Sequence, residues 1–340
     1  MGSQRSFAIP VQGGAAGGSP EAARPPASTT QLDPGCFDSL GTFSPGPGAW
    51  TADTSALVLT DGFTTYTGVA AGNVAVFNFS RINIGPRVTI TGIGSRGLAL
   101  LSQTGITLGG IIDVSGQGTE DFASTGALGG PGGGLGGAFG SDGSGIGGGG
   151  ASPGIPGGGG GGFGGSGAQG GSDGGVGGAT YGDLLTALQG GSGGGSGGTS
   201  VNGAGGGGGA IELGAIGLLH IVAGGMVLAD GGDGAVAANG GSGGGSGGGI
   251  FLHGGSVFLD GFLSATGGDG GVGGGGDGGS GGGGGGGGRI VVLFHDVFSE
   301  TGTHALGGGI SDSSTTTGCR GEGSDHRQAD AGTFDVYQRS

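Results

Sequence analysis

Two histidines, each closing a strongly apolar run, are the first candidates for chemistry. His253 ends the run that begins at Ile250, and His295 ends the run that begins at Ile290. If these runs are neighbouring strands, the two imidazoles lie about 4.8 Å apart, which is the spacing between strands. Such a pair can share a metal ion with Asp296. No further ligand is evident in the pattern, so a surface or corner stack without a ligand is the favoured interpretation.

Aspartates embedded in glycine are the second candidates. They are Asp230, Asp233, Asp269 and Asp277. Calcium-binding β-rolls repeat a Gly-Gly-x-Gly-x-Asp nonapeptide in strict tandem. Residues 267–277 do not keep that spacing, and no apolar residue follows at a fixed offset. Solubilising acidic residues are therefore the favoured interpretation, and calcium binding is the alternative.

Catalysis is not indicated. Pectate-lyase-like enzymes carry acidic residues and Arg or Lys on a strand face, whereas Glu212 and Arg289 are the only such residues expected inside the late strands. Glycoside hydrolysis needs a pair of positioned carboxylates. A glycine-rich phosphate loop ends in Gly-Lys-Ser/Thr, and this chain has no lysine. We expect no catalytic residue, no cofactor-binding residue and no metal ligand.

Composition narrows the classes further. The chain has 340 residues, of which 110 are glycine, and a formal net charge of −15. Its 11 prolines and pure glycine runs do not fit the strict Gly-X-Y repeat of collagen. The acidic balance argues against nucleic-acid binding, which needs a basic patch. No apolar run approaches the roughly 20 residues of a membrane span, and residues 1–30 show no signal-peptide core.

The elements that position these residues form a repeat. Ile211, Ile250 and Ile290 open three apolar blocks at intervals of 39 and 40 residues. Short β-branched runs, each ended by Gly, Pro or Ser, predict strands rather than helices. Three such strands per repeat are typical of one coil of a parallel β-helix. We therefore predict an all-β, right-handed parallel β-helix, with Ile250, Leu252, Val257, Leu259 and Leu263 pointing into its core.

Glycine-rich excursions separate the coils. Residues 116–209 hold 47 glycines, and the two later excursions, 230–249 and 266–288, hold 11 and 18. All leave after an equivalent third strand, at Val114, Ala229 and Ala265, so we expect them to lie side by side. Because glycine lacks a Cβ, extended three-fold helices of it can pack closely as polyglycine II. A side chain at Gly275 or Gly283 would then clash. The frequent serines favour the alternative, a flexible glycine–serine chain.

The predicted organisation has five parts. They are a low-complexity lead-in (1–49), the N-terminal strands and first coil (50–115), a long excursion (116–209), the later coils with their glycine-rich loops (210–298), and a polar C-terminal segment (299–340). Tyr181–Leu188 interrupts the long excursion and is expected to anchor it to the barrel, with a ligand-binding tip as the alternative. The run 332–337 is expected to close the open edge of the last coil. A disulfide between Cys36 and Cys319 would tie the lead-in to the closing segment.

Three stretches carry a likeness to a known group. They are VFNFSRINIGPRVTI (76–90), LALLSQTGITLGGIIDVSG (98–116) and YGDLLTALQGGSG (181–193). The chain resembles large glycine-rich bacterial surface proteins over about residues 70–298. The resemblance implies an extracellular or cell-surface β-helix with glycine-rich loops, and it implies no activity.

The predicted function is therefore that of a non-enzymatic structural or adhesive surface protein. Its expected partners are surfaces, glycans or sister molecules, without nucleic acid and without a membrane span. An ice-binding protein, or another binder of repetitive surfaces, is the first alternative. A polysaccharide-processing β-helix enzyme is the second.

Overall fold

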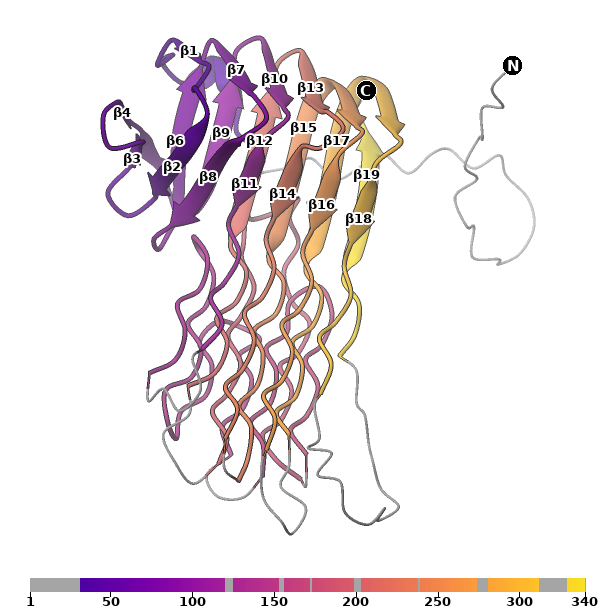
Figure 1. Ribbon diagram of the computed structural model, residues 1–340. Coiled ribbons are helices and arrows are strands. Elements are labelled where there is room, and N and C mark those ends of the chain that lie inside the picture. The colour runs from indigo at the N-terminus through magenta and orange to yellow at the C-terminus, as the bar shows by residue number, and fades with distance from the viewer. Residues whose placement is uncertain are drawn as a thin grey trace, which may run out of the picture.

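The computed structural model describes residues 31–119, 125–152, 156–171, 173–198, 203–237, 239–273, 281–311 and 329–339. Across these residues the chain is β-strand, turn and extended segment, with one 3-10 turn, η1, at Pro34–Cys36. The strands form two largely parallel sheets, one of eleven strands and one of eight. Figure 1 shows the strands stacked in one half of the molecule and long extended segments running side by side in the other.

The larger sheet contains β1 (Thr42–Phe43), β5 (Val69–Ala71), β6 (Val74–Phe79), β7 (Arg81–Ile84), β9 (Gly97–Ser102), β10 (Gly105–Leu108), β12 (Ala210–Ala215), β13 (Leu218–Ile221), β15 (Gly249–Leu259), β17 (Arg289–Glu300) and β19 (Thr333–Gln338). The smaller sheet contains β2 (Gly48–Asp53), β3 (Val58–Thr60), β4 (Thr65–Thr67), β8 (Val88–Ile93), β11 (Ile111–Asp113), β14 (Met226–Leu228), β16 (Phe262–Ser264) and β18 (Thr303–Ala305).

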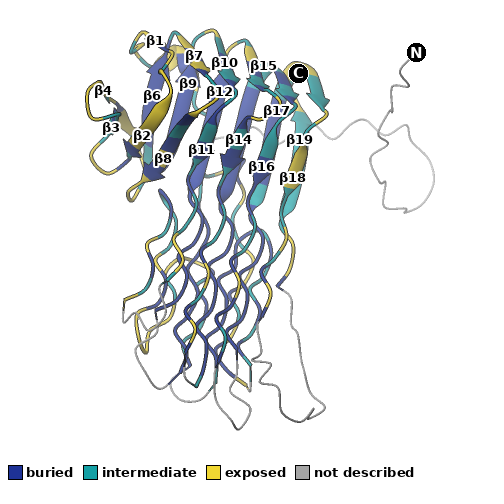
Figure 2. Cartoon of the chain, in the orientation of Figure 1, coloured by how far each residue is buried: buried dark blue, intermediate teal, exposed yellow. Residues whose placement is uncertain are grey.

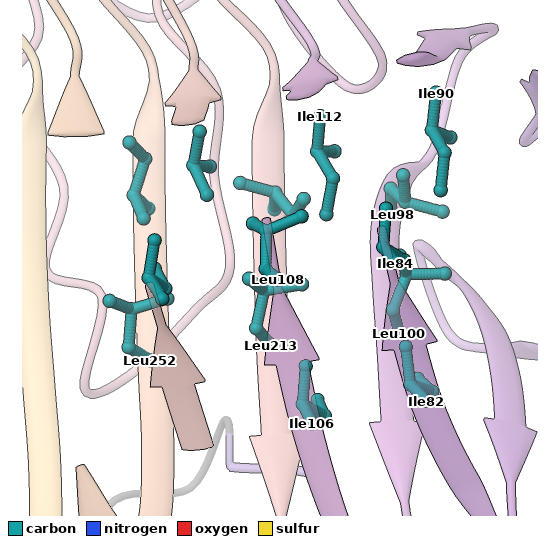
Figure 3. Packing of buried hydrophobic residues seen from close by; sticks show 14 of the residues in the cluster. Ile82, Ile84, Ile90, Leu98, Leu100, Ile106, Leu108, Ile112, Leu213 and Leu252 are labelled. Carbon is teal, nitrogen blue, oxygen red and sulfur yellow. The ribbon is translucent and has the colours of Figure 1, made fainter. Parts of the chain in front are cut away.

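Strand register keeps like residues in line across the apolar blocks. Ile211 of β12 pairs with Ile250 of β15, which pairs with Ile290 of β17. Because side chains alternate between the two faces of a strand, this register places branched residues of these strands in one buried cluster, of which Figure 3 shows Leu213 and Leu252. The predicted core residues are all buried in one cluster and the prediction is confirmed: Ile250, Leu252, Val257, Leu259 and Leu263.

Successive sets of strands pair in the same order. β9, β10 and β11 pair in parallel with β12, β13 and β14. In the set that follows, the single strand β15 pairs with both β12 and β13, with an irregularity between Gly254 and Ser256. The strand order of the larger sheet therefore turns back at β15, and residues of both sheets, for example Leu252 and Leu263, share one buried cluster.

Both ends of the stack differ from its middle. At the first end, antiparallel strands β3, β4 and β5 flank the parallel ones. There Phe43 and Phe79 stack with ring centroids 5.0 Å apart, so part of the low-complexity lead-in belongs to the core. At the other end β19 pairs in parallel with β17, which confirms the predicted closing strand.

The glycine-rich segments all connect strand ends of the smaller sheet to strand starts of the larger sheet. Each leaves from the end of a strand of the smaller sheet, namely β11, β14 or β16. Each returns at the start of β12, β15 or β17 of the larger sheet. The segments therefore lie beside one another, as the common point of departure predicts, and much of their length is buried (Figure 2).

The outer face of the larger sheet is covered by two segments. Leu32 and Phe37 pack on an outer cluster that includes Leu101. Leu184, with Leu185 and Leu188, packs on another that includes Phe251. The segment Tyr181–Leu188 thus anchors the long excursion through a turn closed by hydrogen bonds to the Asp183 carbonyl, as predicted.

Candidate functional site: the glycine bundle and the carboxylate–histidine pairs

The glycine-rich segments form a hydrogen-bonded bundle, and residues 243–248 show its rule. Successive amides donate to three different neighbours in rotation: Gly243 and Ser246 to residues 192–195, Gly244 and Gly247 to residues 283–286, Gly245 and Gly248 to residues 229–232. The donor–acceptor distances run from 2.6 to 3.0 Å. A segment whose direction of bonding repeats every three residues presents its amides to three sides in turn.

Close backbone approach explains why these positions are glycine. A Cβ built on Gly243 would lie 2.0 Å from the carbonyl oxygen of Gly159, and one on Gly283 would lie 2.0 Å from that of Ala168. Neither neighbour is a flexible side chain, so neither can rotate away. The predicted clash at Gly283 is confirmed, whereas Gly275 lies outside the described residues.

The serines of the bundle are structural. Ser192, Ser196, Ser242 and Ser246 are at most 1% exposed. The hydroxyl oxygen of each accepts a bond from a backbone amide; that of Ser246, for example, accepts from the amide of Ser192 at 2.8 Å. Frequent serine was expected to favour a flexible chain, and that expectation is wrong here because these hydroxyls satisfy buried donors.

The aspartates next to the bundle join successive turns. Asp230 accepts bonds from the amide and hydroxyl of Thr266 at 2.7 and 2.9 Å. Asp233 accepts from the amide of Asp269, which in turn accepts from the amide of Ile310. These carboxylates hold backbone amides of the following turn, a role that the solubilising interpretation does not include. Asp277 lies outside the described residues.

A buried carboxylate–histidine pair, Glu212 and His253, lies on the outer face of the larger sheet. The Nε2 atom of His253 lies 2.8 Å from Oε1 of Glu212, and the side chains are 1% and 0% exposed. The ring lies over Gly214, where a Cβ would be only 2.1 Å from Nε2. The amide of Leu32 donates to the same carboxylate oxygen at 2.8 Å. Glu212 is thus enclosed beneath the N-terminal segment.

The predicted stack of two histidines is wrong. His253 pairs in register with Leu293, and Gly254 with Phe294, so His295 does not lie over His253. The side chain of His295 is 64% exposed and bonds to its neighbour Asp296 at 2.7 Å. Among the residues that the structure describes, no three His, Cys, Asp or Glu side chains are grouped as a metal site.

A second cross-turn pair lies nearer the surface. Nε2 of His220 is 2.8 Å from Oδ2 of Asp260, and the hydroxyl of Thr301 donates to Oδ1 of that carboxylate at 2.5 Å. The bond from Thr301, followed by the bond from His220, holds the pKa of Asp260 below its usual value. Sequence reasoning missed this pair, although the 40-residue period places His220 and Asp260 in consecutive turns.

Arg289 serves the junction between sheet and bundle. Its Nε donates to the carbonyl of Tyr181 at 3.1 Å, and its guanidinium lies 5.7 Å from the ring centroid of Phe163. Burial raises the pKa of the Tyr181 phenol, and the bond from Ser192 together with the charge of Arg289 opposes that rise. The Arg289 side chain therefore positions the segment Tyr181–Leu188.

Comparison with known proteins does not assign the chain to a family. No family model, no curated protein and no solved structure matches the chain. The resemblance to glycine-rich surface proteins therefore stays a prediction. In the described part of the chain, no helix is long and apolar enough to cross a membrane. The predicted Cys36–Cys319 disulfide also stays a prediction, since Cys319 lies outside the described residues.

Proposed function

We propose that this chain is a non-enzymatic structural or adhesive protein of the cell surface, built as a parallel β-helix that carries a slab of polyglycine II helices. The observation that carries the proposal is the rotation of hydrogen bonds among three neighbours along residues 243–248. A three-residue turn is the geometry of the extended polyproline II helix. The recurring three-strand path supports the β-helix part of the proposal.

A slab of this kind suits a load-bearing or contact role. Its buried amides are paired across the segments, so the segments cannot shift independently without breaking bonds. Each broken bond that leaves a buried donor or acceptor unpaired costs about 1–3 kcal/mol. The resulting projection is stiff, acidic and free of lysine. Such a body can hold a surface at a fixed distance or present a fixed contact face.

The enzymatic alternative has little support. Glu212, the carboxylate first considered, is fully buried under the N-terminal segment, so a substrate has no access to it in this arrangement. The ice-binding alternative needs a regular ladder of threonines. On the outer face of the smaller sheet, Thr89 and Thr91 are followed in register by Ile111 and Asp113, so the ladder stops after β8.

The test is adhesion by the full chain with an intact bundle and with a damaged one. Beads coated with the parent protein should be retained under flow on polysaccharide-coated or cell-derived surfaces. Beads coated with a Gly243→Val variant, which places a branched side chain against the Gly159 carbonyl, should be retained less. The matched control is Gly307→Val, because the space around Gly307 is open.

Two results would contradict the proposal. One is thermal hysteresis of the freezing point, which would favour the ice-binding function. The other is release of cleaved products from a polysaccharide, which would favour the enzyme. Equal retention of parent and Gly243→Val beads would show that the bundle does not contribute to adhesion.

A further inference from the structure

A groove of about 480 Å³ opens where the smaller sheet meets the glycine bundle. Its lining includes Thr91, Ile93, Asp113, Gln117, Leu128 and Leu135. Ligand sites of proteins typically have volumes of about 300–1,000 Å³. This groove is separate from the carboxylate–histidine pairs and from the covered outer face of the larger sheet.

One wall of the groove is polar. Thr91 of β8 and Asp113 of β11 are register partners on the outer face of the smaller sheet. One carboxylate oxygen of Asp113 accepts the amide of Ser115 at 2.9 Å, and the hydroxyl oxygen of Ser115 accepts the amide of Asp230. The groove therefore carries a serine hydroxyl beside the Asp113 carboxylate. Gln117 adds an exposed carboxamide, which both donates and accepts.

The rest of the lining is apolar and open to solvent. Leu128 is 58% exposed, Leu135 is 51% exposed and Ile93 is 42% exposed. Leu128 and Leu135 stand on the glycine bundle, and Ile93 ends β8. Behind the groove the chain is closely packed at Gly92, where a Cβ would lie 2.9 Å from both Pro131 and Val114. A ligand in the groove would therefore meet polar and apolar groups together.

Charge decides the class of ligand. The lining contains one carboxylate and no arginine, in a chain of net charge −15, so an anion such as a phosphate or a uronate is repelled. A neutral ligand with both hydroxyl groups and C–H faces matches this mixed polar and apolar lining. We propose that this groove binds a neutral saccharide, an inference that rests on the adhesive function proposed above and names its ligand class.

The test uses the full chain and defined probes. Neutral oligosaccharides of glucose, mannose and xylose are titrated calorimetrically at millimolar concentration, with an oligogalacturonate as the anionic probe. At least one neutral probe should bind, and the anionic probe should not. The double variant Leu128→Ala/Leu135→Ala should weaken that binding at least about tenfold, because both apolar contacts are lost. The matched control is Ile146→Ala, since Ile146 is 74% exposed and lies outside the groove.

Three results would overturn the assignment. They are binding by none of the neutral probes, tighter binding of the oligogalacturonate, and equal binding by parent and double variant. Near-ultraviolet circular dichroism confirms that both variants fold. If the parent beads adhere under flow while no neutral saccharide binds, the groove is refuted and the adhesive function stands. If the parent beads do not adhere and no neutral saccharide binds, both proposals fail.

Discussion

A single added methyl group inside the bundle provides the sharpest test of the structure. Gly243→Ala places a Cβ 2.0 Å from the carbonyl oxygen of Gly159, whereas ordinary contact begins near 3.4 Å. Either segment must move by about 1.4 Å. Gly243 donates its amide to Gly195 at 2.9 Å and accepts from the amide of Gly205 at 3.0 Å, while Gly159 donates to Gly150 at 2.9 Å and accepts from Gly195 at 2.8 Å. A movement of that size breaks the two bonds of whichever residue moves.

The expected loss of stability follows from those two bonds. Leaving a buried polar group unpaired costs about 1–3 kcal/mol, so two bonds amount to about 2–6 kcal/mol. Replacing glycine by alanine also restricts the unfolded chain, which returns about 0.4–1 kcal/mol. We expect the free energy of unfolding of Gly243→Ala to fall by about 1–5.6 kcal/mol.

The assay compares two variants by urea denaturation, followed by hydrogen exchange of residues 241–248. Gly307→Ala is the control, because a Cβ there has no neighbour within 4 Å and the backbone needs no positive φ. A flexible glycine linker would tolerate both substitutions equally, and its amides would exchange at the rate of unfolded chain. Equal stability of the two variants, within about 0.5 kcal/mol, would refute the packed bundle.

Three further outcomes are expected. Leu252→Asp buries a carboxylate at a fully buried site and should abolish cooperative folding, whereas Ile146→Asp at an exposed site should be close to neutral by thermal melting. His253→Leu leaves the buried Glu212 carboxylate without its imidazole and should cost about 3–5 kcal/mol, and a double-mutant cycle with Glu212→Met should recover part of that loss by denaturation at neutral pH. The pKa of Asp260 is lowered in the folded protein. The stability that this carboxylate contributes is therefore present above its unfolded pKa of about 3.9 and is lost as the pH falls through the folded pKa. Measured by denaturation across acidic pH, Asp260→Asn should show a smaller loss of stability over that range than the parent.

The strands and the core were predictable because they follow from local rules. Alternation in the runs that begin at Ile250 and Ile290 identifies an inward face without knowledge of any partner. The 39- and 40-residue intervals then fix which strands are neighbours. The register found between Ile211, Ile250 and Ile290 is the one those intervals imply.

The outer face was less predictable, because its cover comes from distant parts of the chain. Glu212 and Phe251 are register partners, so His253 lies only two residues further along the neighbouring strand. That signal was available in the repeat. The cover itself, supplied by Leu32, has no periodic mark in the sequence. The histidine stack failed for a different reason: the 40-residue offset between β15 and β17 places His253 opposite Leu293, so His295 lies two residues further along β17.

The bundle depends on the sheets to fix its alignment. Ordering one residue costs about 1–2 kcal/mol, and glycine is at the costly end of that range. One net hydrogen bond returns only about 0.5–1.5 kcal/mol. A free glycine segment is therefore close to balance or unstable. Strand pairing holds both ends of each segment at equivalent positions, for example at Ala229 and Gly249, so the sheets keep the segments aligned for bonding to one another. Damage to the core should consequently release the bundle, whereas damage to the bundle should leave the core strands paired.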